Sequence, residues 1–84
     1  MKKIYKQKIL ILFGKRLKEL RLQRKLSLRD LAKECDLDNS YISKVEMGKI
    51  NIQFGTIIEL SGGLKVHPSE LFNFKHEWKD EMFE

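Results

Sequence analysis

The chain has 84 residues, of which 42% are hydrophobic, and a net charge of +5, so it is limited to one small domain with a thin core. Its single cysteine excludes an intramolecular disulfide and is typical of a reducing compartment, so we expect a cytoplasmic protein. The charge is uneven, because residues 1–25 carry ten lysines and arginines against Glu19 alone, a net charge of +9. Such a basic end favours an anionic partner such as nucleic acid, although many lysine-rich N-termini are only solubilising tails.

The first predicted helix covers Lys8–Lys25. Its apolar residues recur every three or four positions and form one face opposite several lysines; they are Ile9, Leu10, Phe13, Leu17 and Leu20. The apolar run Ile9–Phe13 is shorter than the roughly 7–15 residues of a signal-peptide core. We therefore expect neither a signal peptide nor a membrane span.

A second, short helix is predicted to begin after Ser27 and to end near Asp36. Ser27 precedes Asp30 by the three positions of a capping box, in which each side chain accepts a hydrogen bond from the other residue's backbone N–H. The apolar side of this helix consists of Leu31, Ala32 and Cys35. This placement favours a packed core thiol for Cys35 over a catalytic nucleophile.

The third predicted helix, about 38–47, is the least apolar. Asp38 is its expected N-cap, because a carboxylate there accepts hydrogen bonds from free backbone N–H groups of the first turn, and Gly48 ends it. Only Ile42 and Val45 supply an apolar side. This helix is therefore either an ordinary surface helix or one that offers its polar face to a partner.

Two further helices complete the pattern, one from Phe54 to the pair Gly62–Gly63 and one that begins at Pro68. No alternating run of strand length is present. We therefore predict an all-α fold of about five short helices in a single domain, 1–84, with a core at 8–72 and a tail at 73–84.

Residues suited to catalysis or metal binding are scattered. His67 precedes a helix-starting proline, His76 lies in the charged tail, and neither is close in sequence to Cys35. These residues do not reach a zinc-ligand pattern, and no phosphate-binding loop is present. We expect no enzyme activity, no metal and no cofactor.

The second and third helices are joined by only about three residues around Leu37, which is a helix-turn-helix arrangement. From Phe13 to Phe72 the sequence resembles the Cro and phage-repressor-like (XRE-like) helix-turn-helix family. The matching stretches are "FGKRLKELR", "LSLRDLAKECDLDNSYISKVEMGK" and "TIIELSGGLKVHPSELF". The resemblance implies a lambda-repressor-like DNA-binding domain.

Three positions depart from the family's usual pattern. Leu28 stands where relatives usually have glutamine, Asp36 where the turn usually has glycine, and Ile52 where a proline usually follows the third helix. Leu28 lacks an amide that touches phosphate in relatives, so Leu28→Gln should tighten binding to any DNA unless Leu28 packs in the core or against a partner chain. Aspartate tolerates a left-handed backbone better than most residues, so Asp36 is expected to be left-handed if the family's turn is kept.

An α-helix fits the major groove of B-DNA and presents residues near its N-terminus to the base edges. The outward residues of the third helix are Asn39, Ser40 and Lys44, which we predict to read bases, because Asn suits adenine, Lys suits guanine and Ser suits either. Contacts to the DNA backbone are predicted for residues that border this face or lie near helix ends: Ser27, Tyr41, Ser43, Lys49, Asn51 and Gln53.

The resemblance also implies an ion pair between Arg21, late in the first helix, and Glu46, just before the end of the third. In relatives such a pair joins the two helices. The alternative is that both side chains are solvated, in which case the pair contributes almost nothing to stability.

The tail, 73–84, lies beyond the resemblance and carries Phe74, Trp78 and Met82 at four-residue steps. If the tail is helical, these residues form one stripe, which must rest on something because an isolated helix of this length is marginal in water. We favour a dimer interface built from the tail with part of the fourth or fifth helix. The alternative is that the tail folds back onto the start of the first helix.

These features predict a small transcriptional regulator, such as a repressor, that binds a palindromic operator in double-stranded DNA as a homodimer. A two-fold dimer reads two half-sites about 34–36 Å apart. An alternative from another class is an antitoxin, which grips a partner toxin and regulates its own production through DNA binding. Restriction-modification controller proteins are a further possibility within the regulator class.

Overall fold

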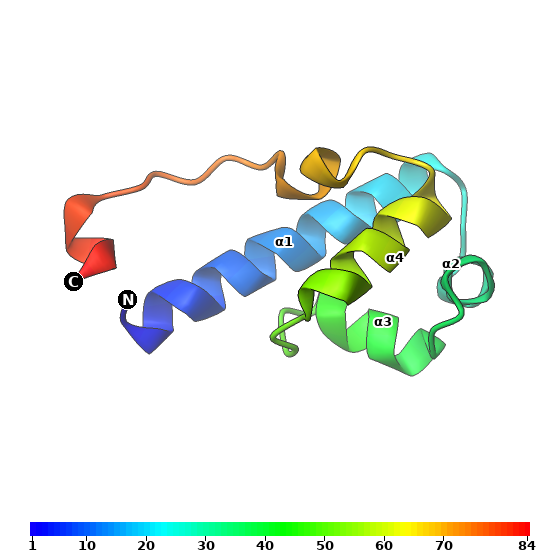
Figure 1. Cartoon of the computed structure of the whole chain (residues 1–84), viewed down its shortest axis with the longest axis horizontal. Coiled ribbons are helices and arrows are strands. Elements are labelled where there is room, and N and C mark those ends of the chain that lie inside the picture. The colour runs from blue at the N-terminus through cyan, green and yellow to red at the C-terminus, as the bar shows by residue number, and fades with distance from the viewer.

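The computed structural model of the chain describes residues 1–84 and contains helices but no strand. Its α-helices are α1 (Lys3–Gln23), α2 (Leu28–Cys35), α3 (Asn39–Glu46) and α4 (Phe54–Leu64), and two short 3-10 helices follow, η1 (Pro68–Phe72) and η2 (Asp80–Phe83). The predicted all-α class is confirmed. The helices α2, α3 and α4 gather around the C-terminal half of α1, while the N-terminal half of α1 projects from the bundle (Figure 1).

The first helix is longer at its start than the sequence pattern predicts. α1 begins at Lys3 rather than at Lys8, and it ends at Gln23 rather than at Lys25. Its buried residues all lie from Phe13 onward, so the residues before Lys8 do not pack in the core, and the apolar pattern of the later turns does not extend to them. Packing of the later turns nucleates the helix, and each earlier residue then adds a backbone hydrogen bond at little cost.

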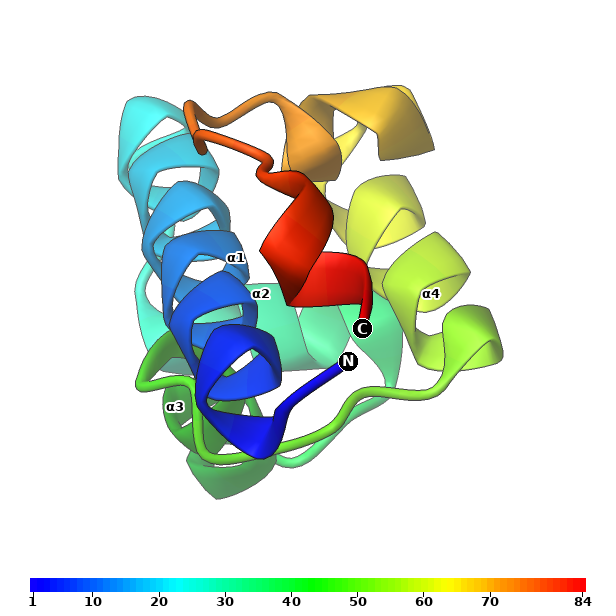
Figure 2. The same ribbon diagram turned by 90° about the vertical axis from the view of Figure 1, so that its left-hand side faces the viewer.

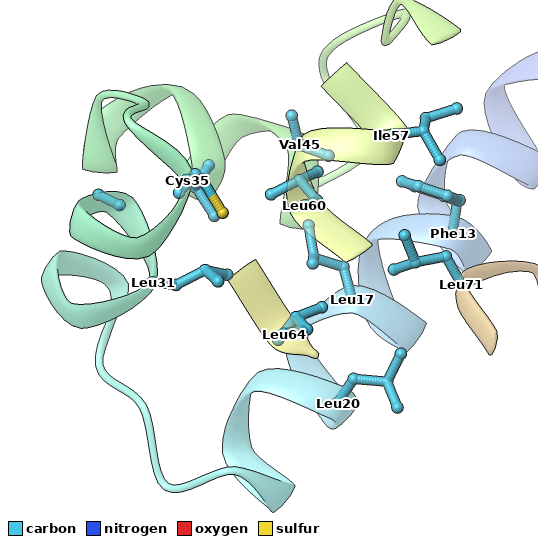
Figure 3. Close-up of a cluster of buried hydrophobic side chains, with 12 residues drawn as sticks. Phe13, Leu17, Leu20, Leu31, Cys35, Val45, Ile57, Leu60, Leu64 and Leu71 are labelled. Carbon is cyan, nitrogen blue, oxygen red and sulfur yellow. The ribbon is translucent and has the colours of Figure 1, made fainter. Parts of the chain in front are cut away.

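The core is one cluster of twelve buried residues from the four α-helices and η1 (Figure 3). Its members are Phe13, Leu17, Leu20, Leu31, Ala32, Cys35, Ile42, Val45, Ile57, Leu60, Leu64 and Leu71. Cys35 is 2% exposed, and burial raises the pKa of its thiol to about 11. The prediction of a packed core thiol is therefore confirmed.

Two glycines allow helices to approach each other closely. A Cβ atom on Gly14 of α1 would collide with backbone carbonyl oxygens at the C-terminal end of α3, and one on Gly63 of α4 would overlap the Cys35 Sγ of α2. The sequence predicts that the pair Gly62–Gly63 ends the fourth helix, but both residues lie inside α4. Gly63 serves this packing against α2 rather than the end of the helix. α4 ends instead at Leu64, and Lys65 follows in the left-handed conformation with φ 57°.

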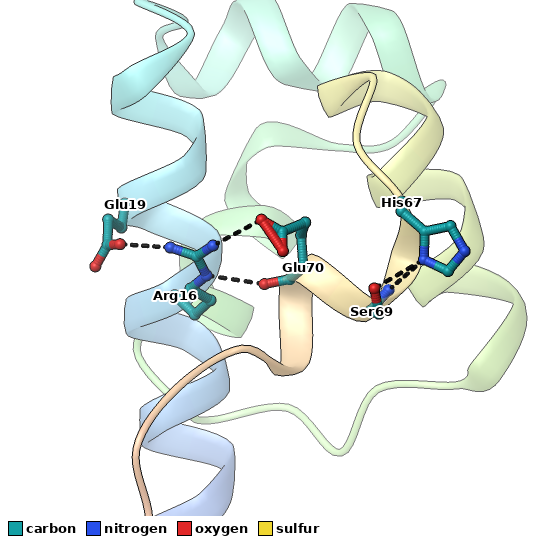
Figure 4. A network of polar contacts seen from close by, with 5 residues as sticks. All are labelled: Arg16, Glu19, His67, Ser69 and Glu70. Atoms are coloured by element: carbon teal, nitrogen blue, oxygen red, sulfur yellow. Dashed lines mark hydrogen bonds and ion pairs between the residues drawn. The ribbon is translucent and has the colours of Figure 1, made fainter.

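The predicted fifth helix is a 3-10 turn, η1, which Arg16 fixes to α1 (Figure 4). The Arg16 Nε donates to the backbone carbonyl of Glu70 at 2.8 Å, and its guanidinium also pairs with the carboxylates of Glu70 and Glu19. His67 caps the turn by accepting a hydrogen bond from the backbone N–H of Ser69. Sequence patterns do not single out Arg16. Its pair with Glu19, three positions away, is an ordinary pair within one helix, and Glu70 is 54 positions away.

The tail is extended over most of its length and runs back beside the projecting half of α1, so that the two termini lie close together (Figure 2). The predicted helical stripe is wrong: Met82 in η2 is 3% exposed, whereas Trp78 is 54% exposed. A twelve-residue helix has too few internal hydrogen bonds to persist alone. The tail thus adopts the alternative arrangement, in which it folds back toward the start of α1.

Candidate nucleic-acid interface

The turn between α2 and α3 has the left-handed geometry expected of a helix-turn-helix. Asp36 has φ 54° and ψ 42°, and its backbone N–H donates to the carbonyl of Ala32. The expectation that Asp36 replaces the usual glycine in this conformation is confirmed. A short left-handed residue here reverses the chain within three residues, so α3 starts directly beside the end of α2.

Side-chain caps define where both helices of the motif begin. The Ser27 hydroxyl accepts from the backbone N–H of Asp30, and the Asp30 carboxylate accepts from the backbone N–H of Ser27, both at 3.0 Å. The Asp38 carboxylate accepts from the backbone N–H of Ser40 at 2.9 Å. Backbone hydrogen bonds, from Ser27 to Asp30 and from Ser40 to Asp38, hold the pKa of each carboxyl below its ordinary value of 3.8.

The third helix has one packed side and one free polar side. Ile42 is fully buried and Val45 is 2% exposed, which fixes the inner side on the core. Ser40 and Lys44, four positions apart on one face of α3, are both exposed, whereas Asn39 at the start of the helix is half-buried. Tyr41 and Ser43 are half-buried at its borders.

Ser40 has a more restricted hydrogen-bonding role than its residue type suggests. Its hydroxyl donates to the Asp38 carboxylate at 3.1 Å. The proton of the hydroxyl is therefore engaged, and the lone pairs of its oxygen remain free to accept. Ser40 is thus suited to accept a hydrogen bond from an amino group of adenine or cytosine.

The residues after α3 form an exposed segment. Gly48, with φ 74°, turns the chain away from the helix axis, and Lys49, Asn51 and Gln53 are all exposed. By contrast, Ser27 is separated from this segment at the start of α2, where the Asp30 carboxylate already occupies the helix end. A phosphate would meet a negative charge there, so Ser27 is the weakest of the predicted backbone contacts.

Arg21 and Glu46 join α1 to the end of α3 through two hydrogen bonds, 2.7 Å from Nε and 3.0 Å from a terminal nitrogen of the guanidinium. Their side chains are only 8% and 6% exposed. Arg21 also donates to the backbone carbonyl of Leu26 at 2.8 Å. The pair is buried and fully engaged, unlike an exposed surface ion pair, so it positions α3.

Two features of this interface were missed or left open by the sequence. Leu28 is half-buried and packs against the core, which supports the alternative that it is a packing residue. Lys3 and Lys6 lie on the projecting part of α1, which the apolar period had excluded from the helix. No helix of the chain combines the length and the apolar composition required to cross a membrane.

Comparison with known proteins places the chain among regulators. Residues 17–71 match the model of the HTH_3 helix-turn-helix family. The chain is 39% identical to the control protein C.BamHI of Bacillus amyloliquefaciens over 67 residues, which cover 79% of this chain and 83% of that protein. It is 41% identical to the control protein C.MunI of Mycoplasma sp, over 77% of this chain and 89% of that protein.

Solved structures agree with these relatives. The restriction-modification controller protein C.AhdI from Aeromonas hydrophila has a TM-score of 0.74 and 43% identity, over 75% of this chain and 96% of that chain. The controller C.Esp1396I has a TM-score of 0.71 and 28% identity, over 76% of this chain and 83% of that chain. Two of these similar proteins are thus named control proteins, and the other two are named restriction-modification controller proteins.

Proposed function

The chain belongs to the HTH_3 helix-turn-helix family, and from this premise we propose that it is the controller of a restriction-modification system. The chain is a small transcriptional regulator that binds specific sequences in double-stranded DNA through α3. Two of its relatives are named control proteins, and the two similar structures are named restriction-modification controller proteins. An antitoxin role has no comparable support, because no observation indicates a toxin partner.

The observation that carries the proposal is the division of α3 into a fixed side and a free side. Ile42 and Val45 anchor one side in the core, and the Arg21–Glu46 pair holds the C-terminal end. Because the helix is held at both places, its outer residues are already ordered, so little conformational entropy is lost when a ligand binds. The polar outer residues match the donors and acceptors of base edges in the major groove.

Each outer residue has a specific proposed role. Asn39 donates to and accepts from adenine, Lys44 donates to guanine O6 or N7, and Ser40 accepts from an amino group. Lys49, Asn51, Gln53, Tyr41 and Ser43 border this face and contact phosphate or sugar, which sets the register of the protein on the duplex.

We further propose that the chain acts as a homodimer through α4. Phe54 is 77% exposed and Ile58 is 43% exposed, and these two residues share a face with Gly62, at which a Cβ would meet only open space. Apolar residues exposed along one helical face suit an isologous contact with the same face of a second copy. The tail is less suited to this role than the sequence suggested, because Met82 is already buried within the chain.

Selection of bound sequences from a random DNA pool tests the proposal. A palindromic motif is expected, with half-site centres about 10 base pairs apart, as a two-fold dimer requires. The motif should recur upstream of a gene for a restriction enzyme in the genome that encodes this chain. Failure to select any motif would contradict DNA reading, and a motif without two-fold symmetry would contradict the dimer.

The variant Ile58→Glu tests the interface, because it places two like charges opposite each other in an isologous contact. We expect this variant to sediment as a monomer at micromolar concentration while its far-ultraviolet circular dichroism is unchanged. Truncation after Phe72 provides the matched comparison and should leave the dimer intact. A monomeric truncated chain would instead assign the interface to the tail.

A further inference from the structure

The surface beside α3 contains a lysine-lined groove, of which the proposed function uses only Lys49 and Asn51. It lies between the projecting half of α1 and the segment after α3, and has a volume of about 860 Å³. We call it the lysine groove. Its polar lining consists of Lys3, Lys6, Gln7, Lys49 and Asn51. Its floor is apolar and includes Leu10, Ile11 and Met47.

The lysines of this groove are free of internal partners. No acidic residue lines the groove, and all the salt bridges of the chain are made by Arg16 and Arg21. Lys3, Lys6 and Gln7 are three and four positions apart, so they share one face of α1. Three ammonium groups without a carboxylate form a site for an anion with several charges.

The opposite face of the projecting half is occupied differently. There, Tyr5 and Lys8 line a second cavity with residues of the tail, among which are two carboxylates and one lysine: Glu77, Glu81 and Lys79. The acidic residues of the tail thus lie on one side of α1, and the tail reaches the lysine groove only through Trp78, which carries no charge. Of the two sides of the projecting half, only the side next to the segment after α3 has lysines with no carboxylate among the lining residues.

From these contacts we infer that the lysine groove binds the phosphate backbone of duplex DNA that flanks the half-site read by α3, an inference that rests on the proposed function. Lys49 and Asn51 belong both to the groove and to the segment predicted to touch phosphate, so the two surfaces are continuous. Lys3 lies about 16 Å along α1 from the crossing with α3 at Gly14, at about 1.5 Å per residue. The projecting half therefore extends the basic surface across several phosphates of a duplex.

The α1 side of this contact lies outside the residues matched by the family model, whereas Lys49 and Asn51 lie within them. The family match begins at Leu17, whereas the lysine groove draws on residues near Lys3 and Lys6. Phosphate contacts carry no sequence information. The groove would therefore raise affinity for long duplexes and leave the preferred motif unchanged.

Two double variants with the same change in net charge test this inference. Lys3→Gln with Lys6→Gln removes the groove lysines of α1. Lys8→Gln with Lys15→Gln removes two lysines from the other side of the helix, about 160° away at about 100° per residue. Both pairs are exposed, so circular dichroism should show that both variants fold, and Lys3→Arg with Lys6→Arg retains the charge.

Binding is measured by fluorescence anisotropy on the selected operator, once as a duplex that ends at the half-sites and once with about ten added base pairs on each side. Wild type and the Lys8/Lys15 variant should both prefer the long duplex. The Lys3/Lys6 variant should lose that preference, bind the long duplex roughly five- to tenfold more weakly at 0.1 M salt, and show a salt slope smaller by about 1.8 per protomer. The arginine variant should behave as wild type.

Three outcomes would overturn the inference. Equal losses in the two glutamine variants would show a general charge effect, and no loss in either would show that the flanks are not touched. Binding to vesicles of phosphatidylglycerol that depends on Lys3 and Lys6, with DNA binding unchanged, would assign the groove to a membrane surface. The proposed function fails separately, namely if wild type prefers no sequence. In that case the two glutamine variants are still compared with each other on random-sequence duplexes.

Discussion

The helices α2 and α3 have the same length, eight residues each, and both begin at a side-chain cap, but they differ in what they bury. α2 buries Leu31, Ala32 and Cys35 and rests against α4, whereas α3 buries only Ile42 and Val45. The first is held by burial along its length, and the second by its two anchors and by an ion pair at its end. A helix held in this way keeps a complete polar face for a ligand.

The largest effect is expected where α3 is held at its end. Arg21→Ala leaves the Glu46 carboxylate buried without a partner, so the free energy of unfolding should fall by about 3–5 kcal/mol in urea denaturation. The double variant Arg21→Met with Glu46→Leu removes both charges and should recover most of this loss. If Arg21→Ala lowers the free energy of unfolding by less than about 1 kcal/mol, the pair is not what positions α3.

A loss of similar kind is expected from the packed side of α2. Leu31 has no exposed surface, so Leu31→Ala should lower the free energy of unfolding by about 2–5 kcal/mol through lost burial and a residual cavity. The sequence preference of the folded fraction should not change. Lys44→Ala is the matched control in α3 and should leave the melting temperature within error, so an equal loss in both variants would remove the contrast between the helices.

Binding is expected to show the reverse pattern. Asn39→Ala and Lys44→Ala should each weaken specific binding by about 1–3 kcal/mol and relax the base preference, because each removes a contact to a base edge. Lys49→Ala should weaken specific and random duplexes alike. Titrations of all three variants on both duplexes decide the matter, and a uniform loss throughout would reject the assignment of base reading to α3.

The position of each helix could be predicted from the sequence to the extent that local chemistry decides it. Caps at Ser27 and Asp38 and the apolar residues of the core are local signals, and the structure has them as predicted. The fixing of η1 by Arg16 depends on Glu70, which is 54 positions away, and the early start of α1 depends on the packing of its later turns rather than on an apolar pattern of its own. No period or cap reports such contacts, because only the folded chain brings them together.

The candidate site shows the same division. The outward side of α3 follows from the spacing of Ile42 and Val45, since positions on the opposite side of the helix, such as Ser40 and Lys44, face away from the core. The engagement of the Ser40 hydroxyl by Asp38 and the open lysine groove depend on three-dimensional geometry. Residue type alone assigns Ser40 both donor and acceptor roles, and it indicates for the N-terminal lysines an anionic partner or a solubilising tail without saying where such a partner would lie.

A smaller effect is expected at Leu28, the first residue of α2. Leu28 is half-buried against the core, so Leu28→Gln should lower the free energy of unfolding by about 1 kcal/mol through lost apolar burial. We expect affinity for DNA to stay unchanged. A gain in affinity of about 0.5–1.5 kcal/mol for any duplex, without loss of stability, would instead show that a glutamine here reaches a phosphate.

The smallest effect concerns the caps that start both helices. Hydrogen bonds lower the pKa of Asp30 and Asp38 from the ordinary value of 3.8, so their contribution to stability is present above that value and is lost as the pH falls through the lowered pKa values. In Asp30→Asn with Asp38→Asn, amides replace the carboxylates and do not titrate. Between about pH 5 and about pH 2, the melting temperature of this variant should therefore fall less steeply than that of wild type.

The placement of Trp78 has an optical consequence. It is the single tryptophan of the chain, it is 54% exposed, and its ring stacks on Phe83 with centroids 5.9 Å apart. Emission excited at the indole band therefore originates from the tail and the edge of the lysine groove, and none originates from the core. A denaturation curve followed by this emission records release of the tail, while ellipticity at 222 nm records melting of the helices, so the two transitions need not coincide.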